Sequence, residues 1–460
     1  MAYKNFDLSV LLKSNPHLSF SQKLKFVCSL SIPGIIAQVS SILMQYIDAA
    51  MVGNLGKNAS AAIGLVASST WVLGSLVHAS SIGYTVQASH AVGEGNQNKA
   101  RAIFLEGVKK CILFSAIVTF MALIISQFLP IWLGAEKEIY KDSTLYFFVY
   151  ALSTPFFQLI YLCGGMLQCS GNMKTPAILN SMLCLLDAFL NIIFIKVLKL
   201  GVFGAALGTS LSSVIVALVM FYYAVYKSKY LCLKGYKSFS SFNKKQINFQ
   251  AIKLATPVAL DKVAFTGALV AITKLIAPLG SVALAANSFA VTAEALCYMP
   301  GYGIQDAAAT LTGQSVGAKR KDLTKSFSWI TVNAAMIIMA FMALLMFIIC
   351  PFVFKMLTPV SEIQNLAIKI LRIELICEPL YGASIVASGA LRGQGDTFVP
   401  CLLNLFSVWV VRLGLSLALV GSFGLLGIWI AMTIELCFRG LIFLIRMMIK
   451  LSCHENCKKS

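Results

Sequence analysis

Eight carboxyl side chains interrupt the long apolar runs of this sequence, where ionisable groups are costly. The chain has only 18 Asp and Glu residues among its 460. Those inside apolar runs are Asp48, Asp187, Asp261, Glu294, Asp306, Glu374, Glu378 and Glu435. A charged side chain in hydrocarbon costs about 2.5 kcal/mol or more, so such groups normally face a polar interior and mark an ion or proton path. A low dielectric also favours the protonated form of a carboxyl group in general, which suits reversible protonation.

Asp48 is the leading candidate for an ion-coupling residue. It shares the first apolar run with Pro33, fifteen residues earlier (48 − 33). A proline inside a helix removes a backbone hydrogen bond and permits bending. We therefore expect a buried Asp48 that faces the interior of its lobe, with Pro33 as the hinge of the same helix.

Asp187 and Asn191 lie one helical turn apart, and Asn180 continues the same polar stripe. A polar stripe in a spanning helix either lines an ion pathway or binds neighbouring helices together by hydrogen bonds. We interpret Asp187 and Asn191 as pathway residues, with the hydrogen-bonding role as the alternative.

Arg412 and Glu435 fall at similar depth in two consecutive apolar runs. Antiparallel helices would bring them together, so they are expected to form a structural ion pair. Asp306 lies near the end of its run and could simply face water.

The sequence lacks the motifs of several kinds of enzyme and metal site. The sequence contains no G-x-x-x-x-G-K-[ST] phosphate loop, and its four histidines do not cluster. The thirteen cysteines are scattered, mostly singly, and indicate neither a disulfide framework nor a metal site. We therefore expect a protein that is not an enzyme, has no metal site and uses no cofactor beyond H⁺ or Na⁺ as a coupling ion.

The positioning elements are expected to be membrane-spanning helices. The chain is 58% hydrophobic and 12% charged, with a mean hydropathy of +0.82, whereas soluble domains carry about 25% charged residues. A spanning helix needs about 20 apolar residues. Twelve runs qualify, at 26–50, 60–86, 107–129, 143–166, 176–198, 202–226, 250–276, 282–311, 328–352, 364–390, 400–420 and 424–449. The predicted fold is therefore an all-α membrane protein with twelve transmembrane helices.

The two halves repeat one pattern at an offset of 224 residues (257 − 33). The repeated pairs include Pro33/Pro257, Gly56/Gly280, Ala62/Ala286, Gly93/Gly317, Pro155/Pro379, Gly165/Gly389, Gly171/Gly395, Pro176/Pro400 and Asn180/Asn404. Gly and Pro constrain the backbone, so the halves should share one fold. Internal repeats in a strongly apolar chain are typical of secondary transporters. We predict two pseudo-symmetric six-helix lobes, at 1–226 and 250–460, joined by a cytoplasmic linker at 227–249.

The net charge of +19 reflects topology rather than nucleic-acid binding. With twelve spans, the Lys- and Arg-rich segments before residue 26, after the second and eighth spans, in the linker and in the tail all fall on one side. The positive-inside rule then places both termini in the cytoplasm. The expected partner of these basic loops is the lipid bilayer.

Several segments resemble the multidrug and toxic compound extrusion (MATE) family, in particular its NorM-like members. Pro33 followed by QYIDAAMVG at 45–53 resembles the family's first-helix motif. LTGQSVGA at 311–318 is similar to the loop after its eighth helix, and GALRGQGDT at 389–397 to the exit of its tenth. The match covers nearly the whole chain.

The resemblance implies two six-helix bundles around a central cavity in the plasma membrane, acting as a monomer. It also implies multidrug efflux by alternating access, in which a cationic, amphipathic compound leaves while H⁺ or Na⁺ enters. The family's first-helix Asp corresponds to Asp48 and its fifth-helix Asn to Asn191.

Three positions depart from the family pattern. An acid found in one branch on the fifth helix is Ile195 here, and the NorM-like acids of the seventh and tenth helices are Phe265 and Tyr381. Asp261 lies one turn before Phe265, and Glu378 three residues before Tyr381. The two acids, with Glu294, are predicted to rebuild a C-lobe cation or substrate site, to which Tyr381 would add a cation–π face. The alternative is that these acids only hydrogen-bond neighbouring helices.

Two other functions are weighed against cation-coupled efflux. A lipid-linked oligosaccharide flippase of the same superfamily would normally show extra spans and a more basic cavity, which the excess of acids disfavours. A membrane receptor or scaffold without transport would have no pathway and would tolerate neutralisation of Asp48.

Overall fold

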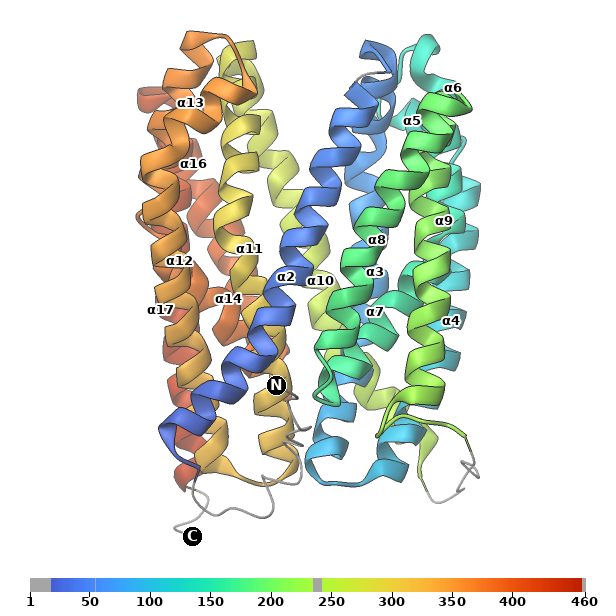
Figure 1. Cartoon of the computed structure of the whole chain (residues 1–460). Helices are drawn as coiled ribbons and strands as arrows, with labels where there is room; N and C mark the ends of the chain where they lie inside the picture. Colours follow the sequence, from blue (N-terminus) through green and yellow to red (C-terminus); the bar gives the residue numbers. More distant parts are fainter. Residues whose placement is uncertain (1–17, 54, 235–241, 457–460) are drawn as a thin grey trace. The chain divides into compact units, whose positions relative to one another are not determined.

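A computed structural model describes residues 18–53, 55–234 and 242–456 of the chain. Part of the predicted linker, at 235–241, lies outside the described residues, as do the terminal segments 1–17 and 457–460. Every regular element of the described residues is helical, as predicted for an all-α fold (Figure 1).

The helices of the first half alternate with short turns. They are α2 (Phe20–Gly53), α3 (Lys57–Gly93), α4 (Gln97–Ile125), α5 (Leu129–Trp132), α6 (Lys137–Leu152), α7 (Thr154–Cys169), α8 (Lys174–Asn191) and α9 (Gly201–Tyr222), with π-helical turns η1 (Ile192–Val197) and η2 (Tyr223–Lys227).

The second half repeats this order. Its helices are α10 (Lys244–Ile276), α11 (Ser281–Gly317), α12 (Lys321–Leu357), α13 (Ser361–Glu374), α14 (Glu378–Gly393), α15 (Phe398–Phe406), α16 (Leu413–Phe423) and α17 (Leu425–Asn456), with a 3₁₀ turn η3 (Ala277–Leu279) and a π-helical turn η4 (Ser407–Arg412).

The predicted repeat is confirmed by where the helices begin. Seven helix starts in the first half lie 224 positions before a start in the second: Phe20/Lys244, Lys57/Ser281, Gln97/Lys321, Lys137/Ser361, Thr154/Glu378, Lys174/Phe398 and Gly201/Leu425. The shared Gly and Pro positions therefore specify one backbone plan twice.

The helix lengths support twelve spans. Among the described residues, ten helices are long and apolar enough to cross a membrane. The pair α6 and α7, bent by 42° at Ser153, makes an eleventh. By the 224-residue offset its counterpart is the pair α13 and α14, which carries more charge and is not among the helices that meet this test. The twelfth span predicted at 364–390 corresponds to this pair.

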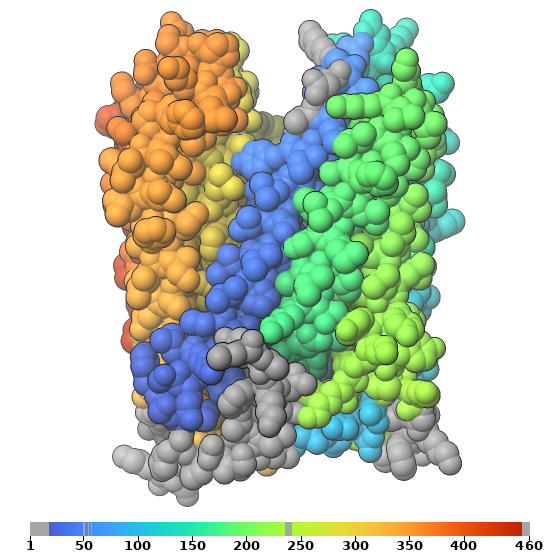
Figure 2. All heavy atoms as spheres, viewed as in Figure 1, coloured from blue at the N-terminus to red at the C-terminus, as the bar shows by residue number. Residues whose placement is uncertain are grey.

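The exposed surface of α12 indicates the environment that surrounds these helices. Figure 2 shows this helix, in orange, on an outer flank. Its exposed large side chains recur every three or four residues, at Ile337, Phe341, Leu344, Ile348 and Phe352. An exposed apolar stripe on a long helix fits contact with lipid tails.

The chain divides into two compact units, each containing part of α2 and part of α10. The described residues of unit 1 are 40–53, 55–234 and 242–262, and those of unit 2 are 18–39 and 263–456. The boundaries predicted at 226 and 250 differ from this division, because they assign α2 wholly to the first lobe and α10 wholly to the second.

Close backbone packing explains the difference. Within unit 2, Gly34 of α2 lies against the backbone of Gly303 of α11 so closely that neither position has room for a side chain. Within unit 1, Gly83 of α3 lies equally close to the backbone of Ala251 of α10, and Gln87 donates to the carbonyl of Ile247 at 3.1 Å. The contact at Gly34 holds the first part of α2 in unit 2, and the contacts at Gly83 and Gln87 hold the first part of α10 in unit 1.

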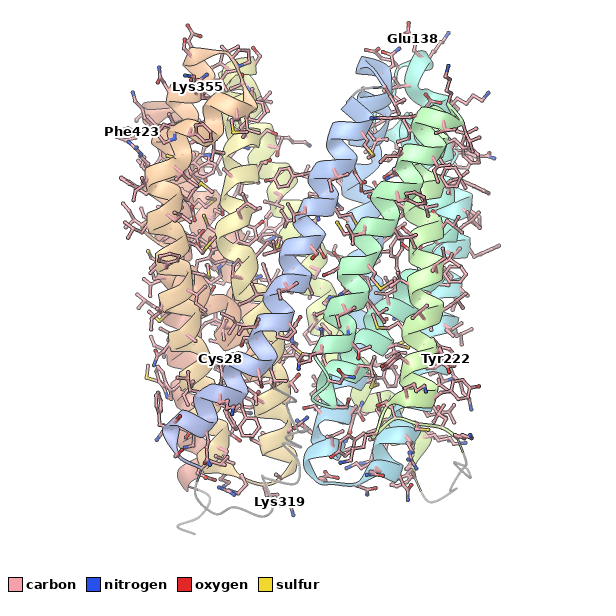
Figure 3. All side chains as sticks on the ribbon, viewed as in Figure 1. Cys28, Glu138, Tyr222, Lys319, Lys355 and Phe423 are labelled. Atoms are coloured by element: carbon pink, nitrogen blue, oxygen red, sulfur yellow. The ribbon has the colours of Figure 1, made fainter. Side chains whose placement is uncertain are left out.

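Unit 2 also shows how charged residues mark the two ends of a helix bundle. Lys319 follows α11 and Lys355 lies in the last turn of α12, and Figure 3 shows them at opposite ends of unit 2. Lys319 belongs to a basic segment with Arg320 and with Lys321 and Lys325 at the start of α12, as the predicted topology requires of this cytoplasmic end.

We predict that Gly83→Ala lowers thermal stability, because the new Cβ would lie 2.7 Å from the Ala251 carbonyl carbon. Overpacking of this kind costs about 1–3 kcal/mol. The matched control is Gly64→Ala on the same helix, where nothing lies within 4 Å of the added atom. Thermal unfolding in detergent compares the two variants, and equal melting temperatures would contradict the packing argument.

Candidate functional site

Three polar side chains of unit 1 form a hydrogen-bonded cluster between α2 and α8. The Asn191 amide nitrogen Nδ2 donates to Asp48 Oδ1 at 3.0 Å and to Asp187 Oδ2 at 3.2 Å. The structure thus brings Asp48 together with Asp187 and Asn191, which the sequence placed on one polar stripe. One neutral amide connects two carboxyl groups from different helices.

The cluster is enclosed to different degrees. Asp187 is fully buried and Asn191 is 2% exposed, whereas Asp48 is half-buried rather than buried as expected. The hydroxyl of Ser212 of α9 is shared between the Thr209 carbonyl at 3.0 Å and Asp187 Oδ1 at 3.4 Å, and the Thr209 side chain also bonds Asp187. Asp48 is therefore the member closest to solvent, and Asp187 the member held by more donors.

A π-helical turn and a small apolar core follow this cluster along the chain. The π-helical turn η1 begins directly after Asn191, and such turns often occur at functional sites. Ile195 of η1 packs with Val52 and Ala205 in a small apolar core, against which Tyr146 also lies. The position that carries an acid in one family branch is therefore part of an apolar contact here. Asp187 supplies an acid eight residues earlier (195 − 187), about two helical turns away.

The carbonyl oxygen Oδ1 of Asn191 is buried and has no hydrogen-bond partner among the described residues. Because the assignment of amide O and N follows the hydrogen-bond network, the two carboxyl acceptors fix Nδ2 on their side. Oδ1 consequently points away from them, toward α9.

Pro33 lies inside α2, which continues through it as a helix. The boundary between the units falls between residues 39 and 40, after Pro33 and before Asp48. A bend near Pro33 would thus act between the two parts of α2, and its role as a hinge stays a prediction.

Unit 2 contains a second acidic cluster at a broken helix. Glu374 ends α13 and Glu378 begins α14, and both are fully buried; Glu294 of α11 is 7% exposed. Neither carboxyl oxygen of Glu378 has a hydrogen-bond partner within the described part of the chain, nor does Oε2 of Glu374. Buried polar groups without partners are rare in folded proteins and often mark a site for water, ions or protons.

Two arginines supply counter-charge in the same region. Glu294 lies within electrostatic range of Arg412 of η4 and of Arg439 of α17. With Glu435, four buried carboxyl groups thus share two guanidinium groups. This part of unit 2 is negative if every group is ionised, so protons or a cation would stabilise it.

The MatE family model matches residues 33–193 and 257–418, which lie in the two repeated halves. This chain belongs to the MatE family.

Relatives and solved structures agree with this assignment. A Thermotoga maritima protein named "Probable multidrug resistance protein NorM" is 26% identical over 427 residues, covering 90% of each chain. The rat "Multidrug and toxin extrusion protein 1" is 24% identical over 453 residues, covering 95% of this chain and 77% of the rat protein. A structure described as the outward-facing conformation of a MATE family transporter has a TM-score of 0.90 at 20% identity, covering 97% of this chain and 98% of that one.

The predicted ion pair between Arg412 and Glu435 is wrong for this MatE family member. Glu435 bonds Arg439, four residues later on α17, at 3.1 Å, and also accepts from Ser407 at 2.5 Å. Arg412 instead contacts the sulfur of Met432. Arg439 lies one turn after Glu435 on the same helix, so the two side chains meet however the neighbouring helices pack.

Tyr381 is engaged by the protein's own cation. The guanidinium carbon of Arg439 lies 5.2 Å from its ring centroid, and the ring of Tyr298 meets it edge-on at 5.6 Å. One face of the ring that was expected to receive a substrate cation is thus occupied by Arg439.

The remaining acids are distributed differently from a single cluster. Asp261 lies in the part of α10 that belongs to unit 1, whereas Glu294 and Glu378 belong to unit 2, so a site shared by all three stays a prediction. Asp306 of α11 is 3.9 Å from Arg392 of α14. Across the described residues, no group of three or more His, Cys, Asp and Glu is arranged to hold a metal ion.

Sequence reasoning overlooked Arg439 and Ser212, and named Glu374 without assigning it to the site. The spacing of Arg439, four residues after Glu435, was a usable signal, as was the Glu374/Glu378 spacing. Nothing in the sequence alone distinguishes Ser212 from its serine neighbours Ser210 and Ser213.

A double-mutant cycle tests the corrected pair. Arg439→Met alone should destabilise the protein by about 3–5 kcal/mol, because it leaves a buried Glu435 charge without its partner. Arg439→Met combined with Glu435→Gln should cost less than the sum of the single changes in thermal unfolding. The control cycle with Arg412→Met and Glu435→Gln should be additive, and strong coupling there with none at Arg439 would restore the original pairing.

Proposed function

We propose that this chain exports small, cationic and amphipathic compounds by cation-coupled antiport with alternating access. The observation that carries the proposal is the Asn191 bridge between Asp48 and Asp187 inside a helical membrane unit. The names of the relatives from Thermotoga maritima and rat support multidrug efflux as the activity.

The coupling follows from competition for the same negative charge. Two carboxyl groups held close together repel each other when both are ionised, and a shared proton relieves the repulsion. A cationic compound that reaches half-buried Asp48 from the solvent would reduce the same repulsion by its positive charge. Binding of the compound would then favour release of the proton, and binding of the proton would favour release of the compound, as reciprocal linkage requires.

Hydrogen-bond geometry supports H⁺ over Na⁺ as the coupling ion in this arrangement. Asn191 donates an N–H to each of the two carboxyl groups, and N–H groups cannot ligate a hard cation. The amide oxygen, which could ligate Na⁺, points away from the carboxyl groups. A proton needs only one carboxyl oxygen and leaves the bridge intact.

The Glu294, Glu374 and Glu378 cluster is proposed as a second cation-responsive site. Its unpartnered carboxyl oxygens support this role. Participation of Asp261 and Tyr381, as expected from the sequence, belongs to the same proposal, although Arg439 occupies one face of Tyr381.

The cellular setting follows from topology. We propose a monomer in the plasma membrane with both termini in the cytoplasm, because the basic loops lie on that side under the positive-inside rule. The flippase alternative is disfavoured by the buried acids of both units. A scaffold without transport would not account for the energetically unfavourable burial of Asp187 and Glu378.

Proteoliposomes loaded with an ethidium-like cation test the proposal. An imposed pH gradient should drive efflux, whereas an imposed Na⁺ gradient at equal pH should drive little efflux. Asp48→Asn should abolish the pH-driven efflux, because an amide cannot accept the coupling proton. Glu378→Gln, which keeps the size of a protonated acid, should slow efflux without abolishing it.

Normal pH-driven efflux by folded Asp48→Asn would remove this residue from the mechanism. Efflux driven only by Na⁺ would reject the proton as the coupling ion. Unchanged efflux by Glu378→Gln would confine coupling to unit 1.

A further inference from the structure

Gly208 of α9 lies directly against the amide of Asn191. A Cβ atom built on Gly208 would overlap Asn191 Oδ1 and would lie 2.9 Å from its Cγ and 3.3 Å from its backbone nitrogen. Real Cβ atoms almost never approach so closely. The missing side chain at position 208 is therefore what allows Asn191 to occupy its place.

Gly208 belongs to a row of small residues with a spacing of four. Gly204, Gly208 and Ser212 follow one face of α9. Gly204 packs against the backbone carbonyl of Phe194 in η1, and Ser212 donates to Asp187. Small residues at this spacing let helix backbones approach closely in membranes. Here the close approach brings a hydroxyl donor to one carboxyl group and seats the amide that bridges both.

The last helix of the second half also packs a glycine against a neighbouring backbone, since Gly427 of α17 lies against the Leu419 carbonyl of α16, but the residues at the 224-residue offset differ. At the 224-residue offset their counterparts on α17 are Ile428, Met432 and Leu436. The same helix pairing occurs there, since α17 packs against α15, η4 and α16 as α9 packs against α8 and η1.

Met432 stands where the first half has Gly208, and its sulfur contacts Arg412. The small residue is thus retained in the half where the fifth helix presents the Asp–Asn pair. The large residue occurs in the half where that helix presents an arginine.

We propose that Gly208 is a positioning residue of the coupling site: by leaving room for Asn191 Oδ1, it holds Nδ2 between Asp48 and Asp187 and so sets how tightly the pair holds its proton. This inference rests on the proposed function of the Asp48–Asp187 pair. The unpartnered, buried Oδ1 is the second observation that supports it. An amide placed for packing alone would not need to leave its oxygen without a donor.

The expected direction follows from the bonds that would be lost. The two Asn191 N–H bonds favour the ionised carboxyl groups, so displacing the amide should strengthen proton binding. The other titratable groups that face the pair are Tyr146 of α6 and Cys184 of α8, and both remain in place in the variant.

The test is the pH profile of gradient-driven efflux in proteoliposomes. Gly208→Ala should move the pH of half-maximal efflux upward by about one unit, a tenfold change in proton affinity. Gly204→Ala is the matched control, because its added atom would lie 2.9 Å from the Phe194 carbonyl oxygen rather than against the amide. It should change the rate or the melting temperature without moving the profile.

Two further variants keep the inference falsifiable if Gly208→Ala folds poorly. Ser212→Ala removes a donor to Asp187 without adding volume and should move the profile in the same direction. Gly208→Ala with Asn191→Ser shortens the displaced side chain but keeps a hydroxyl donor, and should return the profile toward wild type.

The positioning role would be overturned if Gly208→Ala and Gly204→Ala both left the pH profile of efflux unmoved. An unmoved profile in Ser212→Ala would also overturn it. These outcomes are separate from the fate of the proposed function, because Asp48→Asn reports on the coupling pair whatever the result at Gly208.

Discussion

Buried charge in a low-dielectric helix bundle is the constraint that organises this structure. An unpaired carboxylate there is strongly unfavourable, so each acid needs a partner, a proton or a ligand. Unit 1 meets the requirement with an amide and hydroxyl donors around Asp48 and Asp187. Unit 2 meets it partly with guanidinium groups, and leaves both oxygens of Glu378 without hydrogen bonds in the described residues. These incompletely compensated groups give each unit a reason to bind cations.

The chain repeats its fold but not its chemistry. Helix starts recur at 224 residues, yet the counterparts of Asp48 and Asp187 are Ile272 and Val411, and that of Glu378 is Thr154. Gly and Pro positions that specify the backbone are shared, whereas ionisable residues are placed independently in each half. The two units therefore keep the same helix plan while placing their ionisable groups at different positions.

Sequence patterns predicted the helices well, because apolar length and Gly/Pro placement determine them locally. They also identified Asp48, Asp187 and Asn191, since a polar residue in an apolar run is conspicuous. They did not predict partners. Whether Glu435 meets Arg412 or Arg439 depends on side-chain reach and helix rotation. The division of α2 and α10 between units depends on backbone approaches at Gly34 and Gly83, which no single-residue property reveals.

The central claim is that a cationic compound and a proton exchange at the Asp48–Asp187 pair. Its most direct test is proton release on binding, followed with a pH indicator when an ethidium-like cation is added to purified protein in weakly buffered detergent solution. The account predicts saturable proton release that parallels binding, and binding with much reduced release in Asp48→Asn. Binding without proton release by the wild-type protein, or equal release by Asp48→Asn, would contradict it.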